Sequence, residues 1–125
     1  MQKTYTAPLV SIIIPCYNYG QYIKKCIQSA IDQTYENIEV IVVDNGSTDN
    51  SLEEINLFSK NKRVKIIKFK ENVPPGCKEK SAVGIAIKES SGDYISILYA
   101  DDWYLPNKIK KQVDLFDSAP SSVGV

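Results

Sequence analysis

Two adjacent carboxylates, Asp101 and Asp102, directly follow an apolar run at residues 94–100. A strand that delivers two acidic side chains to the edge of a sheet creates a high density of negative charge. That density is costly unless a cation or a cationic ligand occupies the site. We therefore predict that the pair binds a positively charged group.

Polar clusters also follow two other predicted strands. Residues 9–14 form an apolar run that stops at the Pro-Cys-Tyr-Asn of residues 15–18, and residues 40–43 form one that stops at the Asp-Asn-Gly-Ser of residues 44–47. The carboxyl ends of parallel strands lie on one edge of a sheet, so the clusters should converge. We expect Pro15, Asp44 and Asp102 to open onto one crevice.

Each cluster also has a purely structural explanation. Acidic residues before a helix are favoured by the helix dipole, which would account for Asp101 and Asp102. Residues 44–47 are good turn formers whatever their function, and Tyr17 could be a packing aromatic. The convergence of all three clusters on one edge is what favours a binding site.

The elements that must position these residues alternate between strand and helix. Apolar residues at helical spacing predict a helix over residues 21–33. The other predicted elements are a helix through Leu52, Ile55 and Phe58 capped by Asp49 or Ser51, a strand at 64–69, a loop at 72–76, a helix at 78–90, a strand at 94–98, and a helix opened by Leu105 and Pro106. This alternation predicts a three-layer α/β fold, a mostly parallel sheet with helices on both faces.

The bulk composition limits the function classes. At 125 residues and 43% hydrophobic content, the chain is expected to form one domain. A formal net charge of +0 gives no electrostatic argument for a nucleic-acid partner. No apolar run approaches the ~20 residues of a membrane span, and residues 1–6 lack the apolar core of a signal peptide. We expect a cytoplasmic protein.

Cysteine and histidine usage narrows the chemistry further. Cys16, Cys26 and Cys77 are odd in number and do not follow C-x-x-C spacing, which argues against a disulfide framework and a zinc ribbon. The chain has no histidine, which excludes Ser-His and Cys-His nucleophilic pairs. A general base in this protein is therefore expected to be a carboxylate or a less common group.

Three motifs together resemble the family 2 glycosyltransferases of the GT-A fold. They lie at residues 10–18, 42–49 and 92–102, in the family's order and spacing, and the similarity covers nearly the whole chain. The resemblance implies the nucleotide-sugar-binding part of such a domain. The donor-binding residues it implies are Pro15, Tyr17, Asn18, Asp44, Asn45, Lys80 and Asp101, and the metal ligands are Asp102 and Asp101 in a DXD-like site.

The implied reaction moves a sugar, as in hexosyltransferases, from a UDP-sugar donor to an unknown acceptor, with inversion. A Mn²⁺ or Mg²⁺ ion held by carboxylate oxygens would neutralise the departing diphosphate. Tyr17 offers an aromatic face to the base, and Asn45 offers a donor and an acceptor to a pyrimidine edge. The resemblance also suggests bacterial polysaccharide biosynthesis, with the full-length protein at the inner face of the membrane.

The chain departs from the family pattern at three places. Asn45 stands where a second Asp is usual, and Tyr99 replaces the first acid of the Asp-x-Asp-Asp cluster. Residues 82–84 read Ala-Val-Gly where the family often has Ala-Arg-Asn. A cationic contact to phosphate would then have to come from Lys78 or Lys80.

Competing interpretations differ in what they require. A Rossmann dinucleotide domain needs a G-x-G-x-x-G turn after a strand, which residues 15–20 do not supply. A receiver-like signalling module would place its acid pair after the first strand rather than the fourth. A non-catalytic nucleotide- or carbohydrate-binding relative of the same fold remains the alternative.

The end of the chain suggests a piece of a longer protein. Residues 122–125 follow Pro120 and resemble the start of another strand. The family places its acceptor site and general base downstream, so we expect the base beyond Val125. The fragment alone is expected to bind donor weakly, to transfer no sugar, and to dimerise through an exposed edge.

Overall fold

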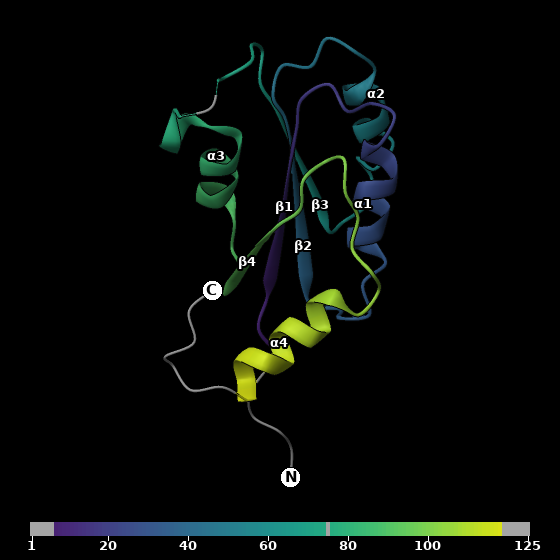
Figure 1. Cartoon of the computed structure of the whole chain (residues 1–125), viewed down its shortest axis with the longest axis vertical. Helices are drawn as coiled ribbons and strands as arrows, with labels where there is room; N and C mark the ends of the chain where they lie inside the picture. The colour runs from purple at the N-terminus through teal and green to yellow at the C-terminus, as the bar shows by residue number, and fades with distance from the viewer. Residues whose placement is uncertain (1–6, 75, 119–125) are drawn as a thin grey trace.

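The computed structural model describes residues 7–74 and 76–118 (Figure 1). The predicted strand at 122–125 and the turn at Pro120 lie outside these residues. The four strands are β1 (Val10–Cys16), β2 (Ile38–Asp44), β3 (Val64–Lys68) and β4 (Tyr94–Ile97). All neighbouring strands pair in parallel, in the order β3-β2-β1-β4. The strand order therefore reverses between β1 and β4, where open α/β sheets form a crevice.

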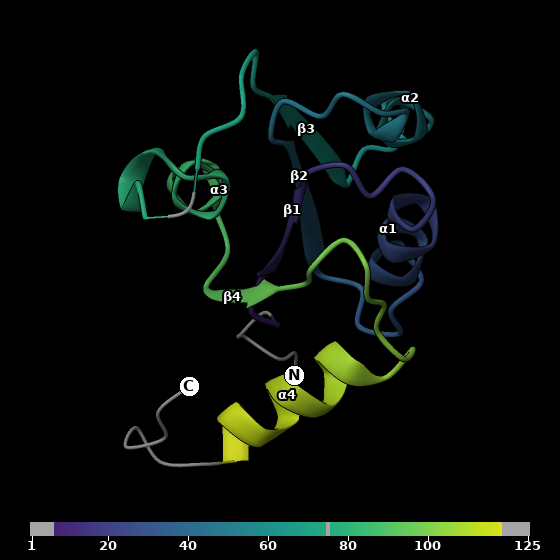
Figure 2. The same cartoon turned by 45° about the horizontal axis from the view of Figure 1, so that its top comes forward.

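Helices cover both faces of the sheet. On one face lie α1 (Ile23–Ile31), α2 (Ser51–Asn56) and α4 (Lys108–Ser118). The 3₁₀ turn η1 (Lys78–Lys80) and α3 (Ala82–Glu89) lie on the other, as Figure 2 shows. This arrangement confirms the predicted three-layer, parallel α/β fold.

The apolar strands are buried because each of their two faces meets a helix. Ile12 and Ile14 pack in the core beneath α1, while Ile13 packs with Ala82 and Ala86 of α3. Side chains alternate between the faces of a strand, so a strand covered on both sides needs a continuous apolar run. Among the described residues, no helix has the length and apolar character that crossing a membrane demands.

β1 runs two residues further than predicted, through Pro15 and Cys16. Its pairing with β4 ends at Ile13 and Ile97, whereas its pairing with β2 continues to Cys16. The main chain of Ile13 faces β4, because its carbonyl accepts the Leu98 N–H at 2.8 Å. Pro15, two residues later, faces the same side beyond the end of β4, so its missing N–H costs no ladder hydrogen bond.

The helices differ from the prediction at their ends. The helix predicted at 78–90 is interrupted at Ser81, whose ψ of 165° is extended and whose Oγ accepts the Gly84 N–H at 3.0 Å. Asn50 is the residue before α2 and makes no side-chain cap, while Asp49 Oδ1 accepts the Ser51 N–H at 2.8 Å. α4 starts at Lys108, later than the prediction at Leu105 and Pro106.

A partly buried polar pair fixes the entry to β4. Ser11 is fully buried, and its Oγ lies 2.5 Å from Glu39 Oε2 on the neighbouring strand. The main-chain N–H of Ser91 donates to the same carboxylate oxygen at 2.6 Å, and that of Gly92 donates to Ser11 Oγ at 2.9 Å. The pair therefore ties the turn before β4 to the two central strands.

The close packing of Gly92 gives a stability prediction. A Cβ at this position would lie 2.3 Å from Ser11 Oγ and 2.7 Å from Ser11 N. Gly92→Ala should lower the free energy of unfolding by about 2 kcal/mol, because the turn must move and the polar pair must open. Urea unfolding monitored by circular dichroism measures this. Ser91→Ala is the matched control, since Ser91 is exposed and contributes its main-chain N–H. Equal midpoints for both variants would contradict the prediction.

Candidate functional site

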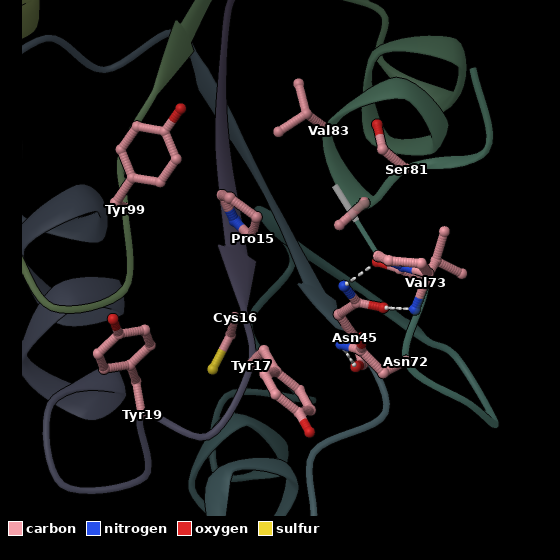
Figure 3. A pocket seen from close by; sticks show the side chains of 12 residues that line it. Pro15, Cys16, Tyr17, Tyr19, Asn45, Asn72, Val73, Ser81, Val83 and Tyr99 are labelled. Atoms are coloured by element: carbon pink, nitrogen blue, oxygen red, sulfur yellow. Dashed lines mark hydrogen bonds between the residues drawn. The ribbon is translucent and has the colours of Figure 1, made fainter. Parts of the chain in front are cut away.

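A cleft of about 480 Å³ lies at the carboxyl edge of the sheet (Figure 3). Pro15, Cys16 and Tyr17 at the end of β1 lie between its two walls. One wall carries Tyr19 and Tyr99. The other wall comprises Asn45, Asn72, Val73 and Pro74, together with Ser81, Ala82 and Val83 at the start of α3.

The lining of the cleft is aromatic and uncharged. Tyr17, Tyr19 and Tyr99 are 42%, 39% and 60% exposed, so their rings are available to a ligand. Within residues 7–74 and 76–118, the lining includes no Asp, Glu, Lys or Arg. Tyrosine rings bind flat groups by stacking and retain a hydroxyl for hydrogen bonding. The cleft is thus suited to a planar, polar-edged group rather than to a free ion.

A network of hydrogen bonds clamps the loop after β1 to the loop after β2. Asn18 adopts a left-handed conformation with φ of 57°, and its Oδ1 accepts from the main-chain N–H groups of Thr48 at 2.8 Å and Asp49 at 3.2 Å. Its own N–H donates to Ser47 Oγ at 2.9 Å. Asn18 does not line the cleft. It fixes the backbone beside Tyr17, and its predicted contact to a donor stays a prediction.

Asp49 extends this clamp. Its Oδ2 accepts the Gly20 N–H at 2.9 Å, while the Tyr19 N–H donates to Ser51 Oγ at 3.0 Å. Desolvation raises the pKa of Asp49, but hydrogen bonds from Ser51 and Gly20 outweigh it and lower the pKa overall. The clamp therefore keeps an ionised carboxylate near neutral pH. A Cβ at Gly20 would lie 1.8 Å from Asn50 Oδ1, so the exposed Asn50 side chain would have to move to admit one.

The prediction that Asp44 opens onto the crevice is wrong. Its side chain is 2% exposed and does not line the cleft. β2 continues to this residue, so Asp44 shares a face with Val42 beneath the helices, whereas Asn45 reaches the cleft. Within the part of the chain that the structure describes, Asp44 Oδ1 has no hydrogen-bond partner. Its role in donor binding stays a prediction.

Asp101 and Asp102 are exposed in the turn after β4 and do not line the cleft, so the prediction that Asp102 opens onto the same crevice as Pro15 is also wrong. Asp102 Oδ1 accepts the Trp103 N–H at 2.9 Å, and the Asp102 N–H donates to the Tyr99 carbonyl at 3.0 Å. The carboxylate pair thus lies in the same turn as Tyr99, which lines the cleft. The described residues contain no group of three or more His, Cys, Asp or Glu side chains that could hold a metal. A cation at this pair would need further ligands from its substrate or from water.

Lys78 and Lys80 are exposed on η1 and do not line the cleft either. The sequence did not identify Tyr19, Asn72, Val73 or Ser81 as site residues. The Tyr-Asn-Tyr of residues 17–19 was a usable signal for Tyr19. The loop at 72–74 carried no such signal, because it reaches the cleft only through a long-range contact.

All three cysteines are free thiols. Burial raises the pKa of Cys26 to about 12, with a smaller contribution from the charges of Cys16 and the Asp101–Asp102 pair. Burial also raises the pKa of Cys16, with Asp44 and Asp49 adding to it against the hydrogen bonds that lower it. Cys16 lines the cleft but is only 1% exposed. It is therefore a packing residue of the cleft rather than a nucleophile.

Comparison with known proteins identifies relatives. The model of Glycosyl transferase family 2 matches residues 11–125. An uncharacterized glycosyltransferase of Rickettsia conorii is 48% identical over 109 residues, which cover 87% of this chain and 17% of the relative. A chondroitin synthase of Pasteurella multocida is 41% identical over 104 residues, covering 82% of this chain and 10% of the relative. The chain spans less than a fifth of the length of either relative.

Solved structures share the fold. S. aureus TarS 1-349 in complex with UDP-GlcNAc superposes with a TM-score of 0.76 at 24% identity, covering 93% of this chain and 36% of that one. A mannosyltransferase of Pyrobaculum calidifontis in complex with GDP-Man and Mn²⁺ also gives 0.76, at 23% identity, covering 95% of this chain and 34% of that one. At these identities the likeness establishes the fold.

The clamp gives a prediction that separates two contributions of Asn18 to stability: the hydrogen bonds of its side chain and the left-handed conformation of its backbone. Asn18→Ala should lower the free energy of unfolding by about 2 kcal/mol, through lost hydrogen bonds and through the cost of a left-handed alanine. Asn18→Gly should lower it by about 1 kcal/mol, because glycine adopts φ of 57° freely. Urea unfolding measures both, with Asn56→Ala at an exposed position of α2 as control. An Ala variant as stable as the Gly variant would show that the backbone there is not strained.

The thiols give a prediction of reactivity. A raised pKa lowers the thiolate fraction, and the thiolate is the species that reacts. At pH 8, iodoacetamide should therefore alkylate exposed Cys77 while sparing buried Cys16 and Cys26 until the protein is unfolded. Mass spectrometry of tryptic peptides, with and without urea, gives the rates. Modification of Cys16 in the native protein as fast as Cys77 would contradict this.

Proposed function

Because this chain belongs to Glycosyl transferase family 2, we propose that its cleft binds the nucleotide part of a sugar donor and presents the sugar for transfer to an acceptor. The observation that carries the proposal is that an exposed carboxylate pair follows closely, along the chain, on a residue that lines an uncharged cleft rich in tyrosine. Tyr99 lines the cleft, and Asp101 and Asp102 follow it within the same turn. A base and a metal-bound diphosphate need these two environments side by side.

We propose that Tyr17 stacks on the base and that Pro15 borders it. Both residues lie between the two walls of the cleft, and 42% of Tyr17 is exposed. The proposed donor is a UDP-sugar. S. aureus TarS, which shares the fold, was solved with UDP-GlcNAc, whereas the Pyrobaculum mannosyltransferase was solved with GDP-Man. Both bases are therefore reasonable ligands to compare in solution.

We propose that Asp102, with Asp101, holds Mn²⁺ or Mg²⁺. Exposed carboxylates fit a hard cation that keeps part of its coordination shell for diphosphate oxygens and water. When bound, such an ion neutralises the negative charge that develops on the leaving diphosphate. The mannosyltransferase that shares this fold was solved with Mn²⁺.

Positive groups on the opposite side of the cleft would supplement the metal. The first turn of α3 contributes Ala82 and Val83 to the lining, and main-chain N–H groups at a helix start favour anions. Lys80, on η1 just before α3, has an exposed side chain. We propose that Lys80 supplies the phosphate contact for which residues 82–84 carry no arginine.

The acceptor site and the general base are proposed to come from residues other than those described here. Among the described residues no carboxylate lines the cleft, and these two relatives are several times longer than this chain. An inverting transfer of a hexose to a growing bacterial polysaccharide is the proposed reaction of the full-length protein. The similarity to a chondroitin synthase supports a polysaccharide acceptor.

Calorimetric titration with UDP, GDP, UDP-GlcNAc and GDP-Man, with and without Mn²⁺, tests the proposal. We expect UDP compounds to bind best, and Mn²⁺ to tighten the binding of diphosphates more than that of uridine. Binding that ignores the metal would favour the non-catalytic relative. Absence of binding for every nucleotide, by a protein whose circular dichroism shows it folded, would overturn the proposed function.

The metal assignment predicts the effect of Asp102→Ala. This substitution should abolish the Mn²⁺-dependent part of UDP binding and leave the melting temperature within about 1 °C, because an exposed carboxylate with a like-charged neighbour contributes little stability. Asp117→Ala, which removes an exposed carboxylate from α4, is the matched control. Equal affinity for UDP and Mn²⁺ in the Asp102 variant and the parent would rule out Asp102 as the ligand.

A further inference from the structure

Asn45 makes a paired contact with the main chain of Val73, 28 residues away (Figure 3). Its Nδ2 donates to the Val73 carbonyl at 3.0 Å, and its Oδ1 accepts the Val73 N–H at 2.8 Å. We infer that Asn45 is a positioning residue that holds residues 72–74 as a wall of the cleft and thereby sets the affinity for nucleotide. This inference rests on the proposed function of the cleft.

The turn after β2 is shaped to receive this loop. Asn72 Nδ2 donates to the Asn45 carbonyl at 3.1 Å, which adds a third hydrogen bond. Gly46 has φ of 70°, and a Cβ there would lie 2.5 Å from Asn72 N and 2.6 Å from the Glu71 carbonyl carbon. The two segments are therefore in direct main-chain contact.

Little else secures the loop. The last ladder hydrogen bond before it is from Phe69 N–H to the Asp44 carbonyl, at 2.8 Å. Within the described part of the chain, the three hydrogen bonds that join residues 70–74 to the rest of the protein all go to Asn45. Asn72 and Pro74 are exposed, and no regular element includes them. The position of the loop thus depends on the side chain and the main-chain carbonyl of Asn45.

The paired contact explains why an amide stands at position 45. An ionised carboxylate would still accept the Val73 N–H, but it has no proton to donate to the Val73 carbonyl. Its second oxygen would instead face the carbonyl oxygen, and two acceptors repel. The Asn that departs from the family's Asp-Asp pattern therefore has a structural cause in this chain.

The same contact changes the role of Asn45 toward a ligand. Its Oδ1 and Nδ2 are both engaged by Val73, so a nucleotide entering the cleft meets a wall that Asn45 has already fixed. If the loop leaves this position, the apparent Kd rises in inverse proportion to the fraction of molecules in which the wall is formed. Affinity is then controlled through the loop rather than through a contact to the base.

The test uses Asn45→Asp, with Asn56→Asp at an exposed position of α2 as a control for the added charge. Hydrogen exchange of the Val73 amide is followed by NMR, and the Kd for UDP with Mn²⁺ is measured by calorimetry. In Asn45→Asp, we expect the Val73 amide to lose nearly all of its protection and the Kd to rise about tenfold, because both follow when the fraction of molecules with the wall formed falls to about a tenth. Exchange of the Ile41 amide in β2 should not change.

The outcomes separate the inference from the proposed function. An unchanged Val73 amide overturns the inference, and so does a raised Kd without faster exchange, which would indicate direct contact with the base. Loss of nearly all protection at Val73 with an unchanged Kd also overturns it, since the wall would not serve the ligand. If the parent protein binds no nucleotide, the proposed function is overturned. Faster exchange of the Val73 amide in Asn45→Asp would then still show that Asn45 holds the loop in place. Should Asn45→Asp fail to fold, Asn72→Ala removes only the third hydrogen bond and should shift both measurements in the same directions by a smaller factor.

Discussion

The structure depends on the unequal pairing of β1 with its two neighbours. β1 pairs with β2 along its full length, but its pairing with β4 ends at Ile13. The last residues of β1 therefore project past the end of β4, and on that side the chain enters a turn in which the Asp102 N–H donates to the Tyr99 carbonyl. This difference opens a cleft at the strand-order reversal, and it places Pro15 where a residue without an N–H is tolerated. The residues that line the cleft come from the segments that border this opening.

Much of this architecture follows from local sequence patterns. Apolar runs such as residues 9–14 and 40–43 predicted strands buried on both faces, and the alternation with helices predicted a parallel sheet. Parallel pairing then required that the turns at 15–18 and 44–47 share an edge. The positions of Pro15, Tyr17 and Asn45 in the cleft agree with that expectation. The match to Glycosyl transferase family 2 confirms the resemblance drawn from the same motifs.

The remainder depended on registers and contacts that no local pattern encodes. Asp44 is buried because β2 continues through it. Side chains alternate between the two faces of a strand, so an error of one residue in where the strand ends assigns a side chain to the wrong face. Tyr99 was noted only as a missing acid, yet it forms part of a wall. The contact between Asn45 and Val73 spans 28 residues, so neither residue signals it. The division of residues 78–90 at Ser81 was equally hidden, because serine is compatible with both a helix interior and a cap.

The clamp centred on Asn18 has a consequence for how a ligand is accommodated. It ties the loop after β1 to the loop after β2 through several main-chain donors, so the conformational entropy of both loops is lost during folding rather than on binding. The loop at 72–74 is joined to the rest of the protein by three hydrogen bonds to a single residue. The cleft thus has one rigid side and one adjustable side. A wider ligand would therefore displace the loop at 72–74 rather than Tyr17 and Tyr19, and it would bind more weakly because the loop would lose its hydrogen bonds to Asn45.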